Sequence, residues 1–253
     1  MRRGRWRLPC RPGLAAVSLL AMAAVPARAE AIAADLSSHL IAINSSFTGA
    51  SVVLFGATDE PGDVIAVVRG PERRTTVWHK ERVFGIWVNA ASVTFAHVPS
   101  FYAVAASRPL DELIPPATAA RYGIGLANLQ FETSPPVAAD RAKRFAAALV
   151  EEHQRVGLFG TATGSITFLG GRLFRATLDF PATVPTGAYV VEAFLVRDGE
   201  VVDRRTAPLS VSKVGLDAAV SDFATRRSAL YGAIAVGIAV VAGWLASLPF
   251  RSV

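Results

Sequence analysis

Short apolar runs, separated by Gly, Pro, Asp and Asn, dominate the chain between residues 30 and 108. The runs are rich in β-branched and aromatic residues, and this pattern bounded by turn residues predicts β-strands. The expected strands cover 51–56, 63–69, 75–79, 83–89, 92–98 and 101–106. Strands at this spacing favour antiparallel pairing, so we expect an N-terminal β module over 30–108 that packs as a sandwich.

The pattern becomes helical over 109–160. Residues 110–130 mix Pro115 and Pro116 with helix formers and predict short helical turns. Residues 139–156 predict a longer helix, since apolar residues mark one face and Gly157 follows as a stop. We therefore expect a helical insert between two β-rich segments.

Strand signals resume over 161–214. Gly170-Gly171 separates two apolar runs, and Asp198-Gly199-Glu200 separates the next two, which predicts two β-hairpins. Residues 208–212 are expected to form a further edge strand, and 185–211 resembles the end of an immunoglobulin-like domain. The fold class is therefore mainly β with a helical insert, in β-sandwich or immunoglobulin-like modules. One interrupted sandwich and two separate β modules both fit the pattern.

The C-terminal residues predict a membrane anchor. Residues 215–228 form a juxtamembrane helix in this interpretation, and 229–250 contain 22 residues without a charge. About 20 apolar residues suffice to cross a bilayer, so we expect one C-terminal transmembrane helix and a cytoplasmic tail over 251–253. Ala235, Ala239 and Gly243 form a stripe of small residues where a second helix could pack, although Ala and Gly are also common in such spans.

The first 29 residues have the pattern of a signal peptide: arginines, a dozen mostly apolar residues, then Ala27-Arg28-Ala29. This leader contains six of the 26 Lys and Arg residues and no acid, so the rest of the chain has equal numbers of basic and acidic residues. The alkaline isoelectric point therefore belongs to the leader, and nucleic acid is not an expected partner. The leader also contains the one cysteine, Cys10, which excludes disulfides, thiol nucleophiles and zinc–thiolate sites from the mature chain.

An aromatic-rich segment over 77–102 contains most of the candidate interaction residues. Trp78 and Trp87 either fill the sandwich core or form an exposed interaction surface with Phe101 and Tyr102. The segments 85–89 (Gly-Ile-Trp-Val-Asn) and 98–104 (Val-Pro-Ser-Phe-Tyr-Ala-Val) resemble an alphaproteobacterial family of transmembrane proteins of unknown function. The resemblance covers essentially the whole mature chain. It implies a single-span membrane protein without an assigned activity. It also implies an association of such proteins with neighbouring permeases of the sulfite-exporter type.

Enzyme chemistry has little support in the sequence. His79 and Glu81 share one face of an expected strand, and His97 on a neighbouring strand could complete a zinc or copper site. Histidines in this setting are more commonly structural, so no metal or other cofactor is expected. The chain has no Gly-x-Ser-x-Gly motif, and residues 160–165 lack the lysine of a phosphate-binding loop.

These observations predict a non-enzymatic protein of the bacterial inner membrane. It would cross the membrane once, with most of the chain in the periplasm, and act as an accessory or interaction subunit of a membrane partner such as a transporter. A periplasmic ligand-binding or metal-binding module is the alternative.

Overall fold

The computed structural model describes residues 30–214, 224 and 227–247, and nearly half of these residues lie in strands. The strands are β1 (Ile32–Leu36), β2 (Leu40–Ile43), β3 (Gly49–Thr58), β4 (Asp63–Arg69), β5 (Glu72–Val83), β6 (Ile86–Pro99), β7 (Tyr102–Ala106), β8 (Gly164–Leu169), β9 (Leu173–Pro181), β10 (Gly187–Arg197) and β11 (Glu200–Lys213). The helices are α1 (Leu110–Leu113), α2 (Pro116–Tyr122), the 3-10 turn η1 (Leu126–Asn128), α3 (Ala139–Arg155) and α5 (Ser228–Ser247). The prediction of a mainly β protein is confirmed.

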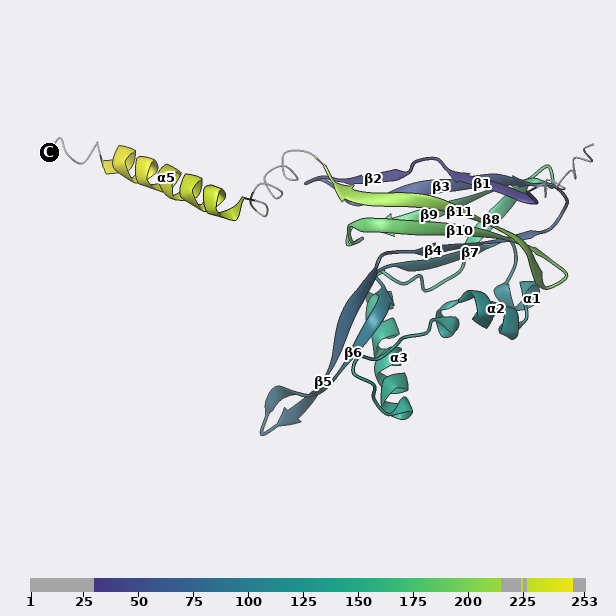
Figure 1. Cartoon of the computed structure of the whole chain (residues 1–253), viewed down its shortest axis with the longest axis horizontal. Helices are drawn as coiled ribbons and strands as arrows, with labels where there is room; N and C mark the ends of the chain where they lie inside the picture. The colour runs from purple at the N-terminus through teal and green to yellow at the C-terminus, as the bar shows by residue number, and fades with distance from the viewer. Residues whose placement is uncertain (1–29, 215–223, 225–226, 248–253) are drawn as a thin grey trace, which may run out of the picture.

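Nine strands form one curled sheet in the order β1-β3-β9-β8-β7-β4-β10-β11-β2. The pairs are antiparallel, except that β7 pairs with β8 and β11 pairs with β2 in parallel. The sheet folds over so that its two halves face each other (Figure 1). Strands from before and after the helices share this sheet, so the chain forms one interrupted sandwich.

The core between the two halves is built from alternating apolar residues. Leu54 and Phe174 come from one half, and Val64 and Leu195 come from the other. The edges of the two halves also meet, because the Asp203 carboxylate accepts hydrogen bonds from the backbone N–H groups of residues 31 and 32 at 2.8 and 3.2 Å. Burial of apolar surface inside the curled sheet is therefore the main source of its stability.

Strand β4 is covered on both faces, which explains its continuous apolar sequence. Val64, Ala66 and Val68 point into the core between the sheet halves, while Ile65 and Val67 belong to a second core on the outer face. A strand that is buried on both sides lacks the apolar–polar alternation of a half-exposed strand. The second core gives the helices and the β5–β6 pair a surface to pack on.

The helices between β7 and β8 cover this outer face. Leu113, Ile124 and Leu149 contribute fully buried side chains to the second core. Arg69 of β4 ties the insert to the sheet, since its guanidinium pairs with Glu192 and donates to the backbone carbonyl of Tyr122 at 2.8 Å. The insert is therefore fixed to the sandwich by both apolar packing and charge-assisted hydrogen bonds.

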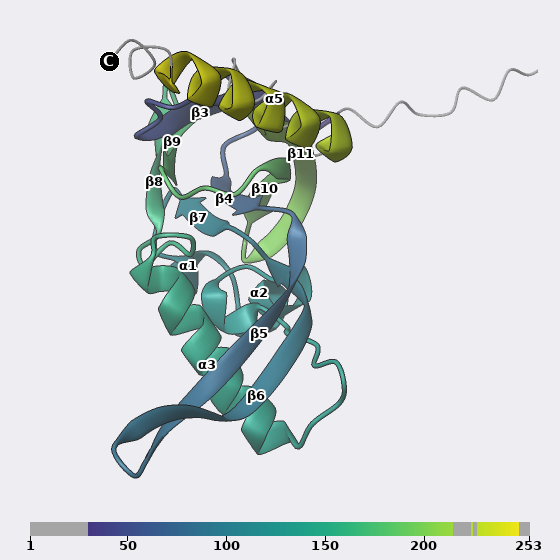
Figure 2. The ribbon, with the colours of Figure 1, turned by 90° about the vertical axis from the view of Figure 1, so that its left-hand side faces the viewer.

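Strands β5 and β6 pair with each other in a long two-stranded ribbon, and an isolated bridge joins Phe95 of β6 to Thr133. Figure 2 shows the ribbon leaving the sandwich alongside α3 and extending past it. The base of the ribbon packs into the second core through Val93 and Phe95, and its far half is exposed. The ribbon is thus a fixed projection with a free end.

Two predicted strand boundaries are wrong. Residues 83–89 were expected to form one strand, but Phe84 and Gly85 form the turn between β5 and β6. Residues 208–212 were expected to form a separate edge strand, but they continue β11, which is paired on both sides. Both differences arise because an apolar run in the sequence does not show whether the chain turns or continues straight. The chain turns within 83–89, and it continues straight through 206–208.

Helix α5 contains 20 residues without a charge, and its apolar side chains are exposed up to Trp244. No helix in the described part of the chain is both long and apolar enough to cross a membrane. The predicted span over 229–250 is therefore not confirmed, and its residues 248–250 lie outside the described residues. The predicted signal peptide (1–29), most of the predicted juxtamembrane helix (215–228) and the predicted tail (251–253) also lie outside them.

Candidate functional site

The free end of the ribbon carries a group of exposed apolar side chains, which we call the aromatic tip. Its members are Phe84, Ile86, Trp87 and Val88, and Trp78 is exposed on the same ribbon roughly 20 Å before Phe84, opposite Ser92. Phe84 is 101% exposed, Ile86 68%, Trp87 66%, Trp78 55% and Val88 39%. Isolated exposed apolar residues are ordinary, but a contiguous group on a projection indicates a contact surface.

The core alternative for Trp78 and Trp87 is therefore wrong, because both side chains face solvent. Phe84, Ile86 and Val88 were not among the predicted surface residues, although they belong to the same tip. The signal that could have revealed them is Gly85 within an apolar run, since glycine at the second central position allows the positive φ of a two-residue hairpin turn.

The register of the ribbon places different chemistry on its two faces. Residues directly opposite each other share a face, and Arg82 lies opposite Trp87 while Glu81 lies opposite Val88. Lys80 shares the face of Arg82, since the two are separated by one residue. One face of the tip thus combines a tryptophan with two cations.

The turn at the apex has an unusual residue for its geometry. Phe84 has φ of 50° and Gly85 has φ of 84°, as a type I′ turn requires. The β8–β9 and β10–β11 turns have the same signs of φ, but they use Gly170-Gly171 and Asp198-Gly199. A bulky aromatic residue in the left-handed region is strained, and Phe84 lies there with a fully exposed ring.

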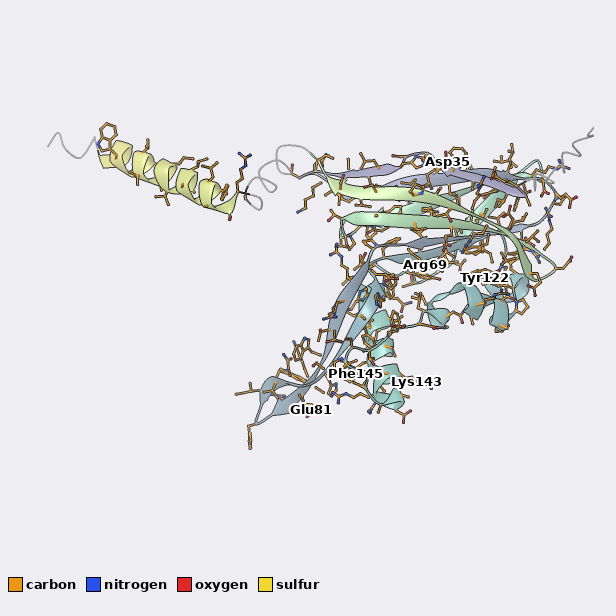
Figure 3. The ribbon with its side chains drawn as sticks, in the orientation of Figure 1. Asp35, Arg69, Glu81, Tyr122, Lys143 and Phe145 are labelled. Atoms are coloured by element: carbon orange, nitrogen blue, oxygen red, sulfur yellow. The ribbon has the colours of Figure 1, made fainter. Side chains whose placement is uncertain are left out.

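Helix α3 lies beside the ribbon and brings further positive charge. The Arg141 guanidinium donates to the Ser92 carbonyl at 3.1 Å and lies 5.7 Å from the centre of the Phe145 ring. Figure 3 shows Glu81 on the ribbon, with Phe145 and Lys143 on the adjacent helix. A hollow of about 400 Å³ lies between the ribbon and α3 and is lined by residues of both.

The structure does not bring the three candidate metal ligands together. His79 lies 3.7 Å from Glu81, but His97 pairs with Glu72 at 2.9 Å, near the base of the ribbon. His79 is seven positions further along β5 than Glu72, which corresponds to roughly 23 Å along a strand. Within the described residues, no three His, Cys, Asp or Glu side chains gather at a position suited to a metal ion.

Phe101 and Tyr102 are buried, which corrects their prediction as interaction residues. They are 2% and 1% exposed. Phe101 stacks on Phe180 with a ring-centre distance of 5.1 Å in the sandwich core. The Tyr102 hydroxyl donates to the Gly123 carbonyl at 2.9 Å and accepts from the Gly125 N–H at 2.8 Å. Burial raises the pKa of Tyr102, so this side chain is a neutral structural bridge to the insert.

The predicted packing stripe of Ala235, Ala239 and Gly243 lies on α5. All three residues are exposed, and a Cβ added at Gly243 would meet no atom within 4 Å. The helix therefore presents this stripe without a packed neighbour among the described residues.

Comparison with known proteins gives one family match. No curated protein matches the chain. A solved structure, "Crystal structure of BslA - A bacterial hydrophobin", is similar over 73% of this chain and 96% of its own, with 11% sequence identity and a TM-score of 0.27. The model of a family described as "Putative transmembrane protein (Alph_Pro_TM)" matches residues 31–252. The chain therefore belongs to this transmembrane protein family.

Proposed function

We propose that the protein is a membrane-anchored, non-enzymatic interaction subunit, and that the aromatic tip is its docking element. The observation that carries this proposal is the exposure of four large apolar side chains at the end of a projecting ribbon, with exposed Trp78 further back on the same ribbon. Tryptophans are frequent among the residues that dominate binding energy at interfaces. The expected partner is an integral membrane protein such as a permease.

The anchor in this proposal is the segment 229–250, which crosses the bacterial inner membrane once. Its support is the absence of charge over 22 residues, the exposed apolar surface of α5 and the transmembrane description of the family. The domain of residues 30–214 then lies in the periplasm after removal of the signal peptide. The start of the family match at residue 31 agrees with a leader that ends near residue 29.

The semi-buried carboxylates Asp63 and Glu192 are both held in contacts within the fold. Asp63 accepts from the Ser107 hydroxyl at 2.8 Å and pairs with Arg108, which holds its pKa below the usual value. Glu192 pairs with Arg69 and Arg204. Each of these groups joins neighbouring elements of the fold.

The anchor is tested by topology. Alkaline phosphatase fused after Lys213 should be active in cells, and the full chain should stay with the membrane after carbonate extraction. Release of the full chain by carbonate would contradict the anchor.

The docking role is tested by co-purification from mild detergent. The full chain should retain a membrane protein, and the double variant Phe84→Ser/Trp87→Ser should lose it while keeping its unfolding temperature. The matched control is Leu169→Ser/Leu173→Ser, which removes two exposed apolar residues beside the β8–β9 turn. Equal retention by the wild type and the tip variant, or a wild-type monomer without any partner, would refute the proposed docking role.

A further inference from the structure

We infer that the aromatic tip also inserts into the interfacial region of an anionic lipid bilayer. This inference rests on the proposed function, because it names a target for the same docking element. It concerns the side chains around Phe84 and the cations behind them.

The composition of the tip matches the chemistry of a bilayer interface. Trp87 is amphipathic, with an apolar ring system and one N–H donor, and tryptophan is enriched where membrane proteins cross the headgroup layer. Phe84 and Ile86 at the apex have no polar group and are the most exposed members of the tip. The tip therefore becomes less polar toward its end.

Charge at this end of the molecule complements anionic headgroups. Residues 78–88 contain Lys80 and Arg82 against Glu81, and residues 139–145 contain three basic residues against Asp140. The two segments together hold five basic and two acidic residues. The remainder of residues 30–214 holds twelve basic and sixteen acidic residues, so the positive charge is concentrated at the ribbon end. Basic clusters beside an apolar element are attracted to anionic lipid surfaces.

The positions of the cations fit an inserted apex. Arg82 precedes Phe84 by two residues and Lys80 precedes it by four, so they lie roughly 7 and 13 Å behind it along the strand. The Arg82 side chain folds toward the turn, where its Nε donates to the Gly85 carbonyl at 3.2 Å. Long cationic side chains hold their charge at the headgroups while their stems lie along apolar groups. Arg82 therefore holds its charge beside the turn and Lys80 holds its charge further back, so the apex can enter the headgroup layer with both cations near phosphate groups.

The strained residue at the apex has no explanation within the fold. The other two hairpin turns of this geometry use Gly or Asp at the position of Phe84. Phe84 is fully exposed, so its ring contributes no packing that would offset the strain. Strained positions that folding does not require point to a functional contact, and an exposed aromatic apex is suited to an apolar target.

The inference is tested with the full chain in nanodiscs that contain equal parts of phosphatidylglycerol and phosphatidylcholine. Cys10→Ser removes the native cysteine, so Ile86→Cys can be labelled alone with the environment-sensitive dye NBD. Labelling at this position leaves Phe84 and Trp87 in place. The label should emit at shorter wavelength and be quenched by nitroxide groups on the lipid chains. The control is the same dye at Leu173→Cys, an exposed apolar position beside a different turn. Its emission should remain that of a dye in water.

Charge provides a second measurement. Lys80→Gln/Arg82→Gln should lower the ratio of inserted to free tip by about five-fold for each charge removed, and nanodiscs of phosphatidylcholine alone should lower it as well. Equal insertion by this variant and the wild type would overturn the electrostatic part of the inference.

The outcomes separate lipid contact from protein contact. An Ile86 label that stays in water in protein-free nanodiscs overturns the lipid inference, and the proposed function survives if the tip variant still loses its partner. A label that enters the bilayer supports the lipid inference even if no partner co-purifies, in which case the proposed partner role fails. A shift that grows with protein density instead of with anionic lipid indicates contact between two copies and overturns the inference.

Discussion

Replacement of Phe84 by asparagine should stabilise the protein, although it removes a large apolar side chain. Phe84 has φ of 50°, and an L-residue in this left-handed region costs roughly 1–2 kcal/mol. Asparagine tolerates the region better because its short polar side chain bonds locally. Since Phe84 is fully exposed, the substitution loses no packing, and relief of part of the strain should add about 0.5–1 kcal/mol to the free energy of unfolding.

Thermal unfolding followed by circular dichroism measures this effect. A domain of this size shifts its Tm by about 2–4 °C per kcal/mol, so Phe84→Asn should raise the Tm by about 1–4 °C. The reciprocal control is Asp198→Phe, because Asp198 occupies the equivalent turn position with φ of 51° and is exposed. Asp198→Phe should lower the Tm by a similar amount. A lower Tm for Phe84→Asn, or an unchanged Tm for Asp198→Phe, would refute the assignment of strain to the apex.

Three further predictions concern groups that hold the sandwich and its insert together. Tyr102→Phe removes the hydroxyl that bridges Gly123 and residue 125. It should reduce the free energy of unfolding, measured by urea titration, by about 1–3 kcal/mol, and an unchanged urea midpoint would contradict the bridging role. Arg108 lowers the pKa of Asp63 below 3.8, so this carboxylate stabilises the fold above about pH 4 and loses that effect as pH falls through its folded-state pKa. Asp63→Asn should be destabilising at pH 7 and progressively less so as the pH falls below 3.8, and an effect of constant size would exclude the linkage. Burial raises the pKa of Tyr189 from 10.0 to about 12, so its stabilising effect is complete below pH 10 and is lost as pH rises through 12. Ultraviolet titration of the wild type should show a tyrosine that ionises near pH 12, and Tyr189→Phe should remove this signal. An unchanged titration of the variant would contradict the shift.

Local sequence patterns were sufficient for most elements of the fold. The turns at Gly170-Gly171 and Asp198-Gly199 are confirmed, since glycine at the second position allows the positive φ that tight hairpins need. The helix predicted over 139–156 is confirmed as α3 with nearly the same bounds. These elements depend on neighbours within a few residues, which is why periodicity and turn residues predict them.

The aromatic tip was harder to predict because its exposure depends on pairing over long distances. Trp78 and Val93 both belong to the ribbon, yet Trp78 is exposed and Val93 is buried. Val93 lies opposite Val77, the neighbour of Trp78, so Val93 and Trp78 are on opposite faces of the ribbon, and only the face of Val93 packs on the second core there. Phe84 was missed for a local reason, because an aromatic residue does not normally mark a type I′ turn.

The sequence by itself determined the mainly β character, the helical insert, the neutral charge and lack of cysteine after residue 29, and the family. Only the tertiary structure decided that one curled sheet unites both β segments, and that Trp87 is exposed while Phe101 and Tyr102 are buried. The physical reason is that strand formation follows the local apolar pattern, whereas burial depends on what packs against each face. The sheet and the insert cover Phe101 and Tyr102, and the ribbon extends Trp87 beyond both.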